Sequence, residues 1–149
     1  MHHIHLNIGS NQGDRILLID RAVALIARAF PQATIATAPD VESPPWGYDS
    51  PHPFINRAVM LDIPGSLEPL DLLAITQDIE QQIGAATPHR HPDGSYADRL
   101  IDIDIIDFDG LRIDSPTLTL PHPHAAERHF VIEPLALLDP DTARRLRNH

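Results

Sequence analysis

The sequence of 149 residues contains no cysteine and few basic residues, and both shortages exclude classes of function. Without cysteine the chain can form no disulfide, no thiolate nucleophile and no cysteine-based zinc ribbon. Eleven basic side chains against twenty-one acidic ones give a net charge of −10 with histidine neutral. Bulk charge therefore disfavours nucleic acid and anionic membranes as partners. An anionic ligand has to be held by a few placed arginines, by metal ions or by backbone amides.

Long apolar segments are also missing. No apolar run reaches the ~18 residues that a membrane helix needs, and the first residues lack the apolar core of a secretion signal. We therefore expect a cytoplasmic protein that binds neither membranes nor nucleic acid. An apolar fraction of 42% over this length predicts one domain, residues 1–149, with one hydrophobic core.

Proline is abundant, by contrast, with fifteen residues that gather around 39–53, 88–92 and 116–123. Because proline fixes φ and removes a hydrogen-bond donor, these stretches are expected to be stiff loops between regular elements. Residues 84–99 show no hydrophobic period at all. Compact domains rarely carry loops longer than ~12–15 residues without a functional reason, so this loop is a candidate for ligand binding.

Hydrophobic periodicity predicts an order of strands and helices. Strict alternation indicates strands, and apolar residues at spacings of three and four indicate amphipathic helices. The expected strands are 3–8, 33–38, 54–63 and 100–108; the expected helices are 14–30, a helix capped by Ser66 that ends at Gly84, and 125–138, followed by a basic tail, 143–149. Asp109-Gly110 predicts a two-residue hairpin that joins the last strand to residues 111–113. This is the split βαβ order, so we expect an α+β fold in which helices pack on an antiparallel sheet.

Two aspartates on one strand give the clearest chemical signal. In Ile101-Asp102-Ile103-Asp104-Ile105 the carboxylates share one face, while the isoleucines enter the core on the other. Carboxylates ~6.5–7 Å apart along a strand repel unless a cation lies between them, and Mg²⁺ is the ion that oxygen ligands of this kind favour. The alternation alone is equally compatible with a solvated acidic face.

Several other residues suit an anionic or a flat ligand. Arg90, Arg99, Arg112 and Arg128 lie in or near loops, where guanidinium groups could bind phosphate bidentately or simply face solvent. The stiff loop around Trp46 precedes Phe54 and Asn56, and an aromatic residue and an amide on one strand face suit a heterocycle with a donor–acceptor edge. The same loop could also pack as part of the core.

Polar and histidine pairs carry weaker signals. Gln77 and Glu80 lie one helical turn apart, away from the apolar stripe, which is typical of solvated residues. The pairs His89-x-His91 and His122-x-His124 lack both helical spacing and a nearby third ligand, so they do not predict a zinc site.

These elements, in this order, resemble the 6-hydroxymethyl-7,8-dihydropterin pyrophosphokinase family of folate biosynthesis. The resemblance covers nearly the whole chain, and its motifs are specific as a set. They are Gly9-Ser10-Asn11, Pro44-Pro45-Trp46-Gly47, Phe54-Ile55-Asn56, Gln77-x-x-Glu80, Asp98-Arg99-x-x-Asp102-x-Asp104-Ile105, Leu120-Pro121-His122 and Arg128-x-Phe130.

The resemblance implies a ferredoxin-like monomer that transfers the terminal diphosphate of ATP to the hydroxymethyl group of 6-hydroxymethyl-7,8-dihydropterin and releases AMP. Catalytic roles would fall to Arg99, Asp102, Asp104 and Arg128, with two Mg²⁺ ions on the two aspartates. The implied pterin contacts are Ser43, Pro44, Trp46, Phe54, Asn56 and Phe130, with the phenylalanine rings on either side of the pterin and Asn56 at its edge. The implied ATP contacts are Gln77, Glu80, Tyr96, Arg99, Ile105, Thr119, His122 and Arg128.

The chain departs from the family pattern at three places. The family commonly has Trp-Gly-Pro-Arg where this chain has Tyr96-Ala97-Asp98-Arg99, and an aromatic residue where it has Pro123. Ala85-Ala86-Thr87 stand where arginines usually follow, and Arg90 is expected to supply that contact to ATP. Two alternatives stay open: a metal-dependent phosphohydrolase that uses Asp102, Asp104 and histidines, and a non-catalytic ferredoxin-like binding module.

Overall fold

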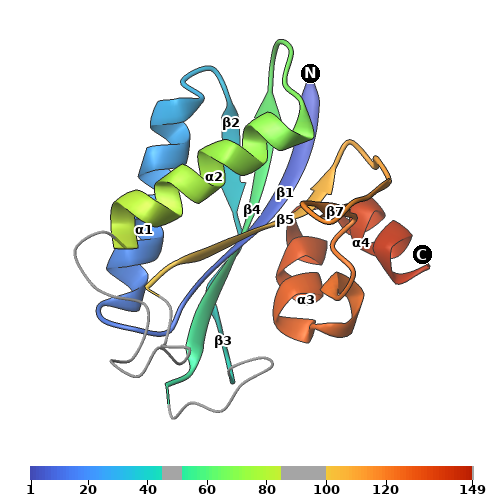
Figure 1. Cartoon of the computed structure of the whole chain (residues 1–149). Coiled ribbons are helices and arrows are strands. Elements are labelled where there is room, and N and C mark those ends of the chain that lie inside the picture. Colours follow the sequence, from blue (N-terminus) through green and yellow to red (C-terminus); the bar gives the residue numbers. More distant parts are fainter. Residues whose placement is uncertain (45–51, 85–99, 149) are drawn as a thin grey trace.

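Two long strands, β1 and β4, form the centre of the sheet (Figure 1). The computed structural model describes residues 1–44, 52–84 and 100–148. Its elements are β1 (His2–Ser10), α1 (Arg15–Ala29), β2 (Thr34–Thr37), β3 (Val41–Ser43), β4 (Phe54–Ile63), α2 (Pro69–Gly84), β5 (Asp102–Phe108), β6 (Ile113–Asp114), β7 (Thr119–Leu120), the 3₁₀ turn η1 (Ala125–Glu127), α3 (His129–Leu138) and α4 (Pro140–Arg147). The strand order is β2-β4-β1-β5, all antiparallel, and β3 also pairs with β4. This order confirms the predicted split βαβ sheet of an α+β fold.

Helices cover both faces of the sheet. Helices α1 and α2 lie on one face, where they bury the apolar side chains that alternate along the strands, such as Ile4, Leu6 and Ile8 of β1 (Figure 1). Helices α3 and α4 pack on the other face around a second, smaller apolar cluster that includes Ile106 and Leu135. The larger cluster forms the main core, and the second face is left more polar.

Helix α1 begins and ends where the sequence predicts. The side chain of Asp14 accepts a hydrogen bond from the backbone N–H of Leu17 at 3.2 Å, which caps the first turn. The helix ends before Pro31, as predicted. Ile16, however, belongs to the predicted apolar stripe but is 52% exposed, because the first turn of α1 extends beyond the edge of the core.

A bulge in β5 lets neighbouring isoleucines enter opposite cores. Ile105 pairs with Leu6, and Asp107 pairs with His5, so Ile106 is an extra residue between two regular pairs. Ile105 packs in the core under α1 and α2, whereas Ile106 packs against α3 and α4. The bulge thus joins the two halves of the fold without disturbing Asp102 and Asp104, which alternate with core residues as predicted.

The turn at Asp109-Gly110 forms, but the predicted hairpin does not. Both residues have positive φ, 56° and 69°, and Leu111 N donates to Phe108 O at 2.9 Å. The following strand β6 pairs with β7 instead of β5, so the predicted pairing is wrong. The reason is that the returning chain occupies the edge of β5, where His122 N donates to Ile106 O at 2.8 Å.

Other boundaries also differ from the prediction. The proline-rich stretch 39–53 contains a strand, β3, because its residues pair with the start of β4. Helix α2 begins at Pro69 and has Gly84 as its last residue, and Glu68 rather than Ser66 precedes it. The predicted helix 125–138 is interrupted at Arg128, whose backbone is extended, and the predicted basic tail is helix α4. None of the described helices is long and apolar enough to cross a membrane.

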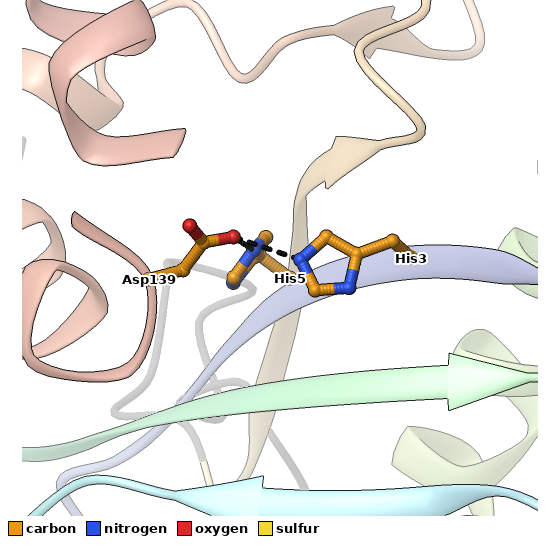
Figure 2. A group of neighbouring side chains, drawn as sticks. All are labelled: His3, His5 and Asp139. Atoms are coloured by element: carbon orange, nitrogen blue, oxygen red, sulfur yellow. Dashed lines mark hydrogen bonds and ion pairs between the residues drawn. The ribbon is translucent and has the colours of Figure 1, made fainter. Parts of the chain in front are cut away.

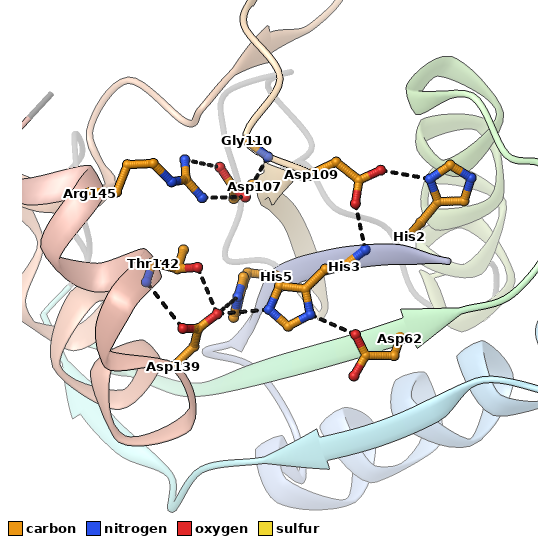
Figure 3. Close-up of polar contacts among 10 residues, drawn as sticks. All are labelled: His2, His3, His5, Asp62, Asp107, Asp109, Gly110, Asp139, Thr142 and Arg145. Carbon is orange, nitrogen blue, oxygen red and sulfur yellow. Dashed lines mark hydrogen bonds and ion pairs between the residues drawn. The ribbon is translucent and has the colours of Figure 1, made fainter.

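Polar contacts fix α4 to the sheet. Asp139 caps α4, and its Oδ2 accepts hydrogen bonds from Nε2 of His3 at 2.8 Å and of His5 at 3.0 Å (Figure 2). Six residues later, on α4, both terminal nitrogens of Arg145 donate to the carboxylate of Asp107, at 2.9 and 3.0 Å (Figure 3). Asp107 is buried, so this pair holds a carboxylate inside the protein that would otherwise be costly to bury.

Replacing Arg145 is therefore expected to destabilise the protein. In Arg145→Ala the buried Asp107 keeps its hydrogen bond from the Gly110 N–H but loses both hydrogen bonds from the guanidinium group. We expect the free energy of unfolding to fall by ~2–3 kcal/mol, less than for a fully buried pair, because Arg145 is 45% exposed and water can reach the carboxylate. Denaturant unfolding measures this loss. Arg144→Ala, on the same helix but in an exposed pair with Asp141, should change it by less than ~0.5 kcal/mol, and equal effects of the two would contradict the account.

Candidate active site

One row of residues crosses three strands on the face of the sheet that α1 and α2 do not cover. Gly9 of β1 pairs with Asn56 of β4 on one side and with Asp102 of β5 on the other. Neighbouring strands lie ~4.8 Å apart, so the row, called the Gly9 row below, spans about 10 Å from amide to carboxylate. In the next row, Asn7 pairs with Asp104. The sheet therefore brings an amide and two carboxylates together across a residue that has no side chain.

The amide of Asn56 is fixed by β3. Its Nδ2 donates to Val41 O at 3.1 Å and to Ser43 Oγ at 2.7 Å, and the side chain is buried. These bonds use both N–H groups, and they set which way the amide points. Its Oδ1 lies 3.3 Å from where a Cβ on Gly9 would stand, so the carbonyl oxygen faces the Gly9 row as an acceptor for an N–H donor.

Two phenylalanines flank this part of the site. Phe54 lies on the same face of β4, and its ring comes within 3.3 Å of a Cβ built on Gly9. Phe130 lies in the first turn of α3, which packs against β4, but the residue is only 7% exposed and belongs to the second apolar cluster. Phe54, which is half-buried, is thus the more accessible of the two residues.

Arg128 lies close to both aspartates. Burial lowers the pKa of its guanidinium, while the charges of Asp104 and Asp102 act in the opposite direction, which places both carboxylates within its electrostatic range. The extended backbone at Arg128, between η1 and α3, brings the side chain to this face of the sheet. The group remains a cation, as arginine does in proteins. Arg128, a predicted catalytic residue, therefore lies near Asp102 and Asp104, the predicted metal ligands.

His122 contributes a neutral imidazole beside Arg128. Burial, together with the nearby charges of Arg128 and His124, lowers the pKa of His122 to about 4. At neutral pH this ring is a hydrogen-bonding group without charge. Together with Thr119 and Arg112 it lines a cavity of about 620 Å³ between β6, β7 and the end of α4.

Glu80 holds β5 in position. Its Oε2 accepts a hydrogen bond from the backbone N–H of Ile103 at 2.8 Å, so the carboxylate is attached to the strand between the two aspartates. Gln77 lies one turn earlier on α2 and is exposed. Spacing alone is typical of solvated residues, and the family resemblance implies that both contact ATP. The structure shows that Glu80 holds the strand that carries Asp102 and Asp104.

Other predicted residues fall into separate groups. The side chain of Ile105 lies in the main core, so a ligand on the other face could contact only its backbone. Ser43 is buried at the end of β3, where it pairs with Phe54 of β4, and the next residue, Pro44, is exposed. Trp46, Arg90, Tyr96 and Arg99 lie outside the described residues.

The residues present fit a hard divalent ion. Asp102 and Asp104 are both partly exposed on one face and bring oxygen ligands, the kind that Mg²⁺ prefers. Asn7 pairs with Asp104, and its buried Oδ1 has no hydrogen-bond partner within the described part of the chain. This oxygen is therefore a further acceptor that a bound ion or its water could use. Two carboxylates leave most ligand positions to water and phosphate, as in many nucleotide sites.

Sequence reasoning missed Asn7. Its spacing from Gly9 places it on the site face, but its neighbour Asp104 comes from a strand almost one hundred residues later, and only the observed register joins them. It also missed a cluster of His3, His5 and Asp139 farther along the same face. The alternation of His3 and His5 indicates that the two histidines share one face of the strand. Their partner Asp139, the N-cap of α4, could not be predicted from the sequence.

Comparisons with known proteins show what this chain is similar to in sequence. A family model described as 7,8-dihydro-6-hydroxymethylpterin-pyrophosphokinase (HPPK) matches residues 5–140. The 2-amino-4-hydroxy-6-hydroxymethyldihydropteridine pyrophosphokinase of Porphyromonas gingivalis is 38% identical over 138 residues, which cover 92% of this chain and 90% of that protein. The protein of the same name from Bacillus subtilis is 36% identical over 132 residues, which cover 89% of this chain and 75% of that protein.

A solved structure shows the same fold. The crystal structure of an HPPK-DHPS in complex with substrates matches 91% of this chain with a TM-score of 0.63 at 12% sequence identity. This chain spans 41% of that one, so the likeness concerns less than half of the larger protein. At this identity the match supports the fold alone.

The contact between Glu80 and β5 predicts a specific loss of stability. Glu80→Ala leaves the N–H of the buried Ile103 without this acceptor, and we expect the free energy of unfolding to fall by ~1–3 kcal/mol. Glu80→Gln keeps an acceptor oxygen and should recover most of the loss. Gln81→Ala, an exposed neighbour on α2, serves as the control and should change stability by less than ~0.5 kcal/mol. Wild-type stability of Glu80→Ala in urea unfolding would show that the contact does not hold β5.

Proposed function

This chain belongs to the 7,8-dihydro-6-hydroxymethylpterin-pyrophosphokinase family, and we propose that its Gly9 row places the pterin beside two Mg²⁺ ions held by Asp102 and Asp104. The reaction moves the diphosphate of ATP to the hydroxymethyl group of 6-hydroxymethyl-7,8-dihydropterin and releases AMP, a step of folate biosynthesis. The observation that carries the proposal is the register in which Gly9 separates Asn56 from Asp102.

The pterin end of the site is suited to a ligand edge that carries N–H donors. Because both N–H groups of Asn56 are used on β3, the side chain can offer only its carbonyl oxygen to a ligand. A pterin presents ring and amino N–H groups along one edge, and these match an acceptor. The half-buried Phe54 is proposed to support the ring system, with Phe130 of α3, Ser43, Pro44 and Trp46 as further contacts.

The phosphate end is built from charges of both signs. Mg²⁺ at Asp102 and Asp104 would neutralise the phosphate charge and polarise the phosphoryl oxygens. Arg128, already within range of both carboxylates, is placed to donate to phosphate oxygens, and Arg99 is proposed as a second donor. The neutral His122, which is within electrostatic range of Arg128, lines a cavity together with Thr119 and is proposed to contact the nucleotide.

The chemical step then depends mainly on positioning. The hydroxymethyl oxygen attacks the β-phosphorus and its proton passes to solvent. A new O–P bond forms, and the bond from the β-phosphorus to the oxygen that bridges it to the α-phosphate breaks, which releases AMP. Such phosphoryl transfers need in-line placement and stabilised charge more than a strong base. Rigid placement is what this chain supplies: β3 fixes Asn56, and Glu80 fixes the strand that carries both aspartates. Gln77, Arg90, Tyr96 and the backbone of Ile105 are proposed to bind the ATP.

The two alternatives find less support. A phosphohydrolase of the kind considered above needs histidines or further acids near Asp102 and Asp104. Within residues 1–44, 52–84 and 100–148, the one group of three metal-ligating side chains is elsewhere, at His3, His5 and Asp139. A non-catalytic module would not need a cation placed against two carboxylates. Incubation with ATP, Mg²⁺ and the hydroxymethyl-dihydropterin separates the three, since AMP, free phosphate or no product would form respectively.

Loss of one proposed metal ligand should abolish most of the turnover. Asp104→Asn keeps the shape of the side chain but removes half of the anionic charge that holds the ions, and we expect kcat to fall by about 10²–10³-fold or more. AMP release at several Mg²⁺ concentrations measures this. Asp141→Asn, an exposed acid on α4, is the matched control and should keep wild-type rates. Normal turnover of Asp104→Asn at limiting Mg²⁺ would refute the metal assignment.

A methyl group at Gly9 should affect the pterin more than ATP. In Gly9→Ala the new Cβ stands 3.3 Å from both Asn56 Oδ1 and the Phe54 ring, a tight contact that pushes both away from the ligand. We expect KM for the pterin to rise about tenfold or more, with KM for ATP within about twofold. Thermal melting checks that the fold survives. An unchanged pterin KM would mean that the ring does not lie over Gly9.

A further inference from the structure

A second group of ligand atoms lies on the same sheet face, away from Asp102 and Asp104. His3 and His5 point from β1 toward Asp139, which begins α4 (Figure 2). One atom from each side chain lies within 4.8 Å of the other two. The proposed pyrophosphokinase reaction uses none of the three, and all come from well-defined elements, a central strand and a helix cap.

The spacing of these atoms is close to that of a coordination shell. Nε2 of His3 and Nε2 of His5 lie 2.8 and 3.0 Å from Oδ2 of Asp139. Ligands on a tetrahedral Zn²⁺ with bonds of about 2.0 Å are about 3.3 Å apart. For these two pairs a shift of a few tenths of an ångström would reach the ligand spacing of a zinc site, and the two histidine atoms lie within 4.8 Å of each other.

Partners outside the group orient two of the three ligands. Nδ1 of His3 lies 2.6 Å from Asp62 Oδ1, so the ring is held with Nε2 toward Asp139 (Figure 3). The Asp139 carboxylate accepts from Thr142 N at 3.1 Å and from Thr142 Oγ1 at 2.6 Å. A histidine that donates to a carboxylate while its other nitrogen binds metal is the usual outer shell of a zinc site.

We propose that His3, His5 and Asp139 form a zinc-binding site that joins β1 to the start of α4. Two imidazoles and one carboxylate suit Zn²⁺ better than Mg²⁺ or Ca²⁺, which take oxygen ligands. His5 is 1% exposed and Asp139 is largely buried, so a bound ion would be shielded on the protein side, with water as its fourth ligand. Zinc there would tie the helical pair α3 and α4, which carries Arg128 and Phe130, to the central strand.

Zinc titration of the metal-stripped full chain tests this site directly. Calorimetry at pH about 8, where histidine is neutral, should show one tight equivalent of Zn²⁺ per chain. At zinc 100-fold above Kd, Tm should rise by roughly 5–10 °C. Absence of both effects would overturn the proposal.

Matched variants locate the ion. Asp139→Asn preserves helix capping but removes the charged ligand, and His3→Gln changes a half-exposed ring, so both should fold. Each should weaken zinc binding by more than the roughly 10–100-fold expected for the outer partner in Asp62→Asn. Circular dichroism confirms that each variant is folded.

Two further variants serve as controls. His124→Gln, an exposed histidine elsewhere, and Asp104→Asn, in the proposed Mg²⁺ site, should bind zinc as the wild type does. Tight zinc binding that survives Asp139→Asn would mean that the ion is bound by other histidines, such as His122 and His124, and would contradict the proposal. Because Asp104→Asn tests turnover and Asp139→Asn tests zinc, failure of one proposal leaves the other distinguishable.

Discussion

The arrangement of the site depends on one missing side chain. At Gly9 the central strand presents only backbone between Asn56 and Asp102. A planar ligand can therefore lie across β1, with one edge at the Asn56 amide and its reacting hydroxymethyl group toward the carboxylates. A Cβ there would stand 3.3 Å from two groups of the site. The antiparallel register fixes this spacing, because each pairing partner faces the same side of the sheet.

The rest of the fold keeps that row rigid. Glu80 attaches β5 from the α2 side, and β3 fixes Asn56 through two hydrogen bonds. The bulge at Ile106 lets β5 contribute to both apolar clusters, so the strand is packed on its two faces. Helices α3 and α4 are attached by polar contacts as well as by the smaller apolar cluster, because the face they cover carries His3, His5 and Asp107 beside Ile106.

The sequence predicted those features that local physics determines. Alternation located β1, β4 and β5, periodicity located α1, and the alternating isoleucines placed Asp102 and Asp104 together. Features set by distant partners were missed: β3 exists because β4 offers an edge, β6 pairs with β7 because returning chain occupies β5, and Asp139 meets His3 only after folding. The roles of the site residues came from the family resemblance, and the register supplies their geometry.

Diffraction from crystals grown with a non-hydrolysable ATP analogue, the pterin and Mn²⁺ in place of Mg²⁺ tests the central claim most directly. The account predicts anomalous peaks for manganese beside Asp102 and Asp104, and a pterin ring over Gly9 with an N–H edge at the Asn56 oxygen. Manganese bound elsewhere, or a pterin ring away from the Gly9 row, would contradict it.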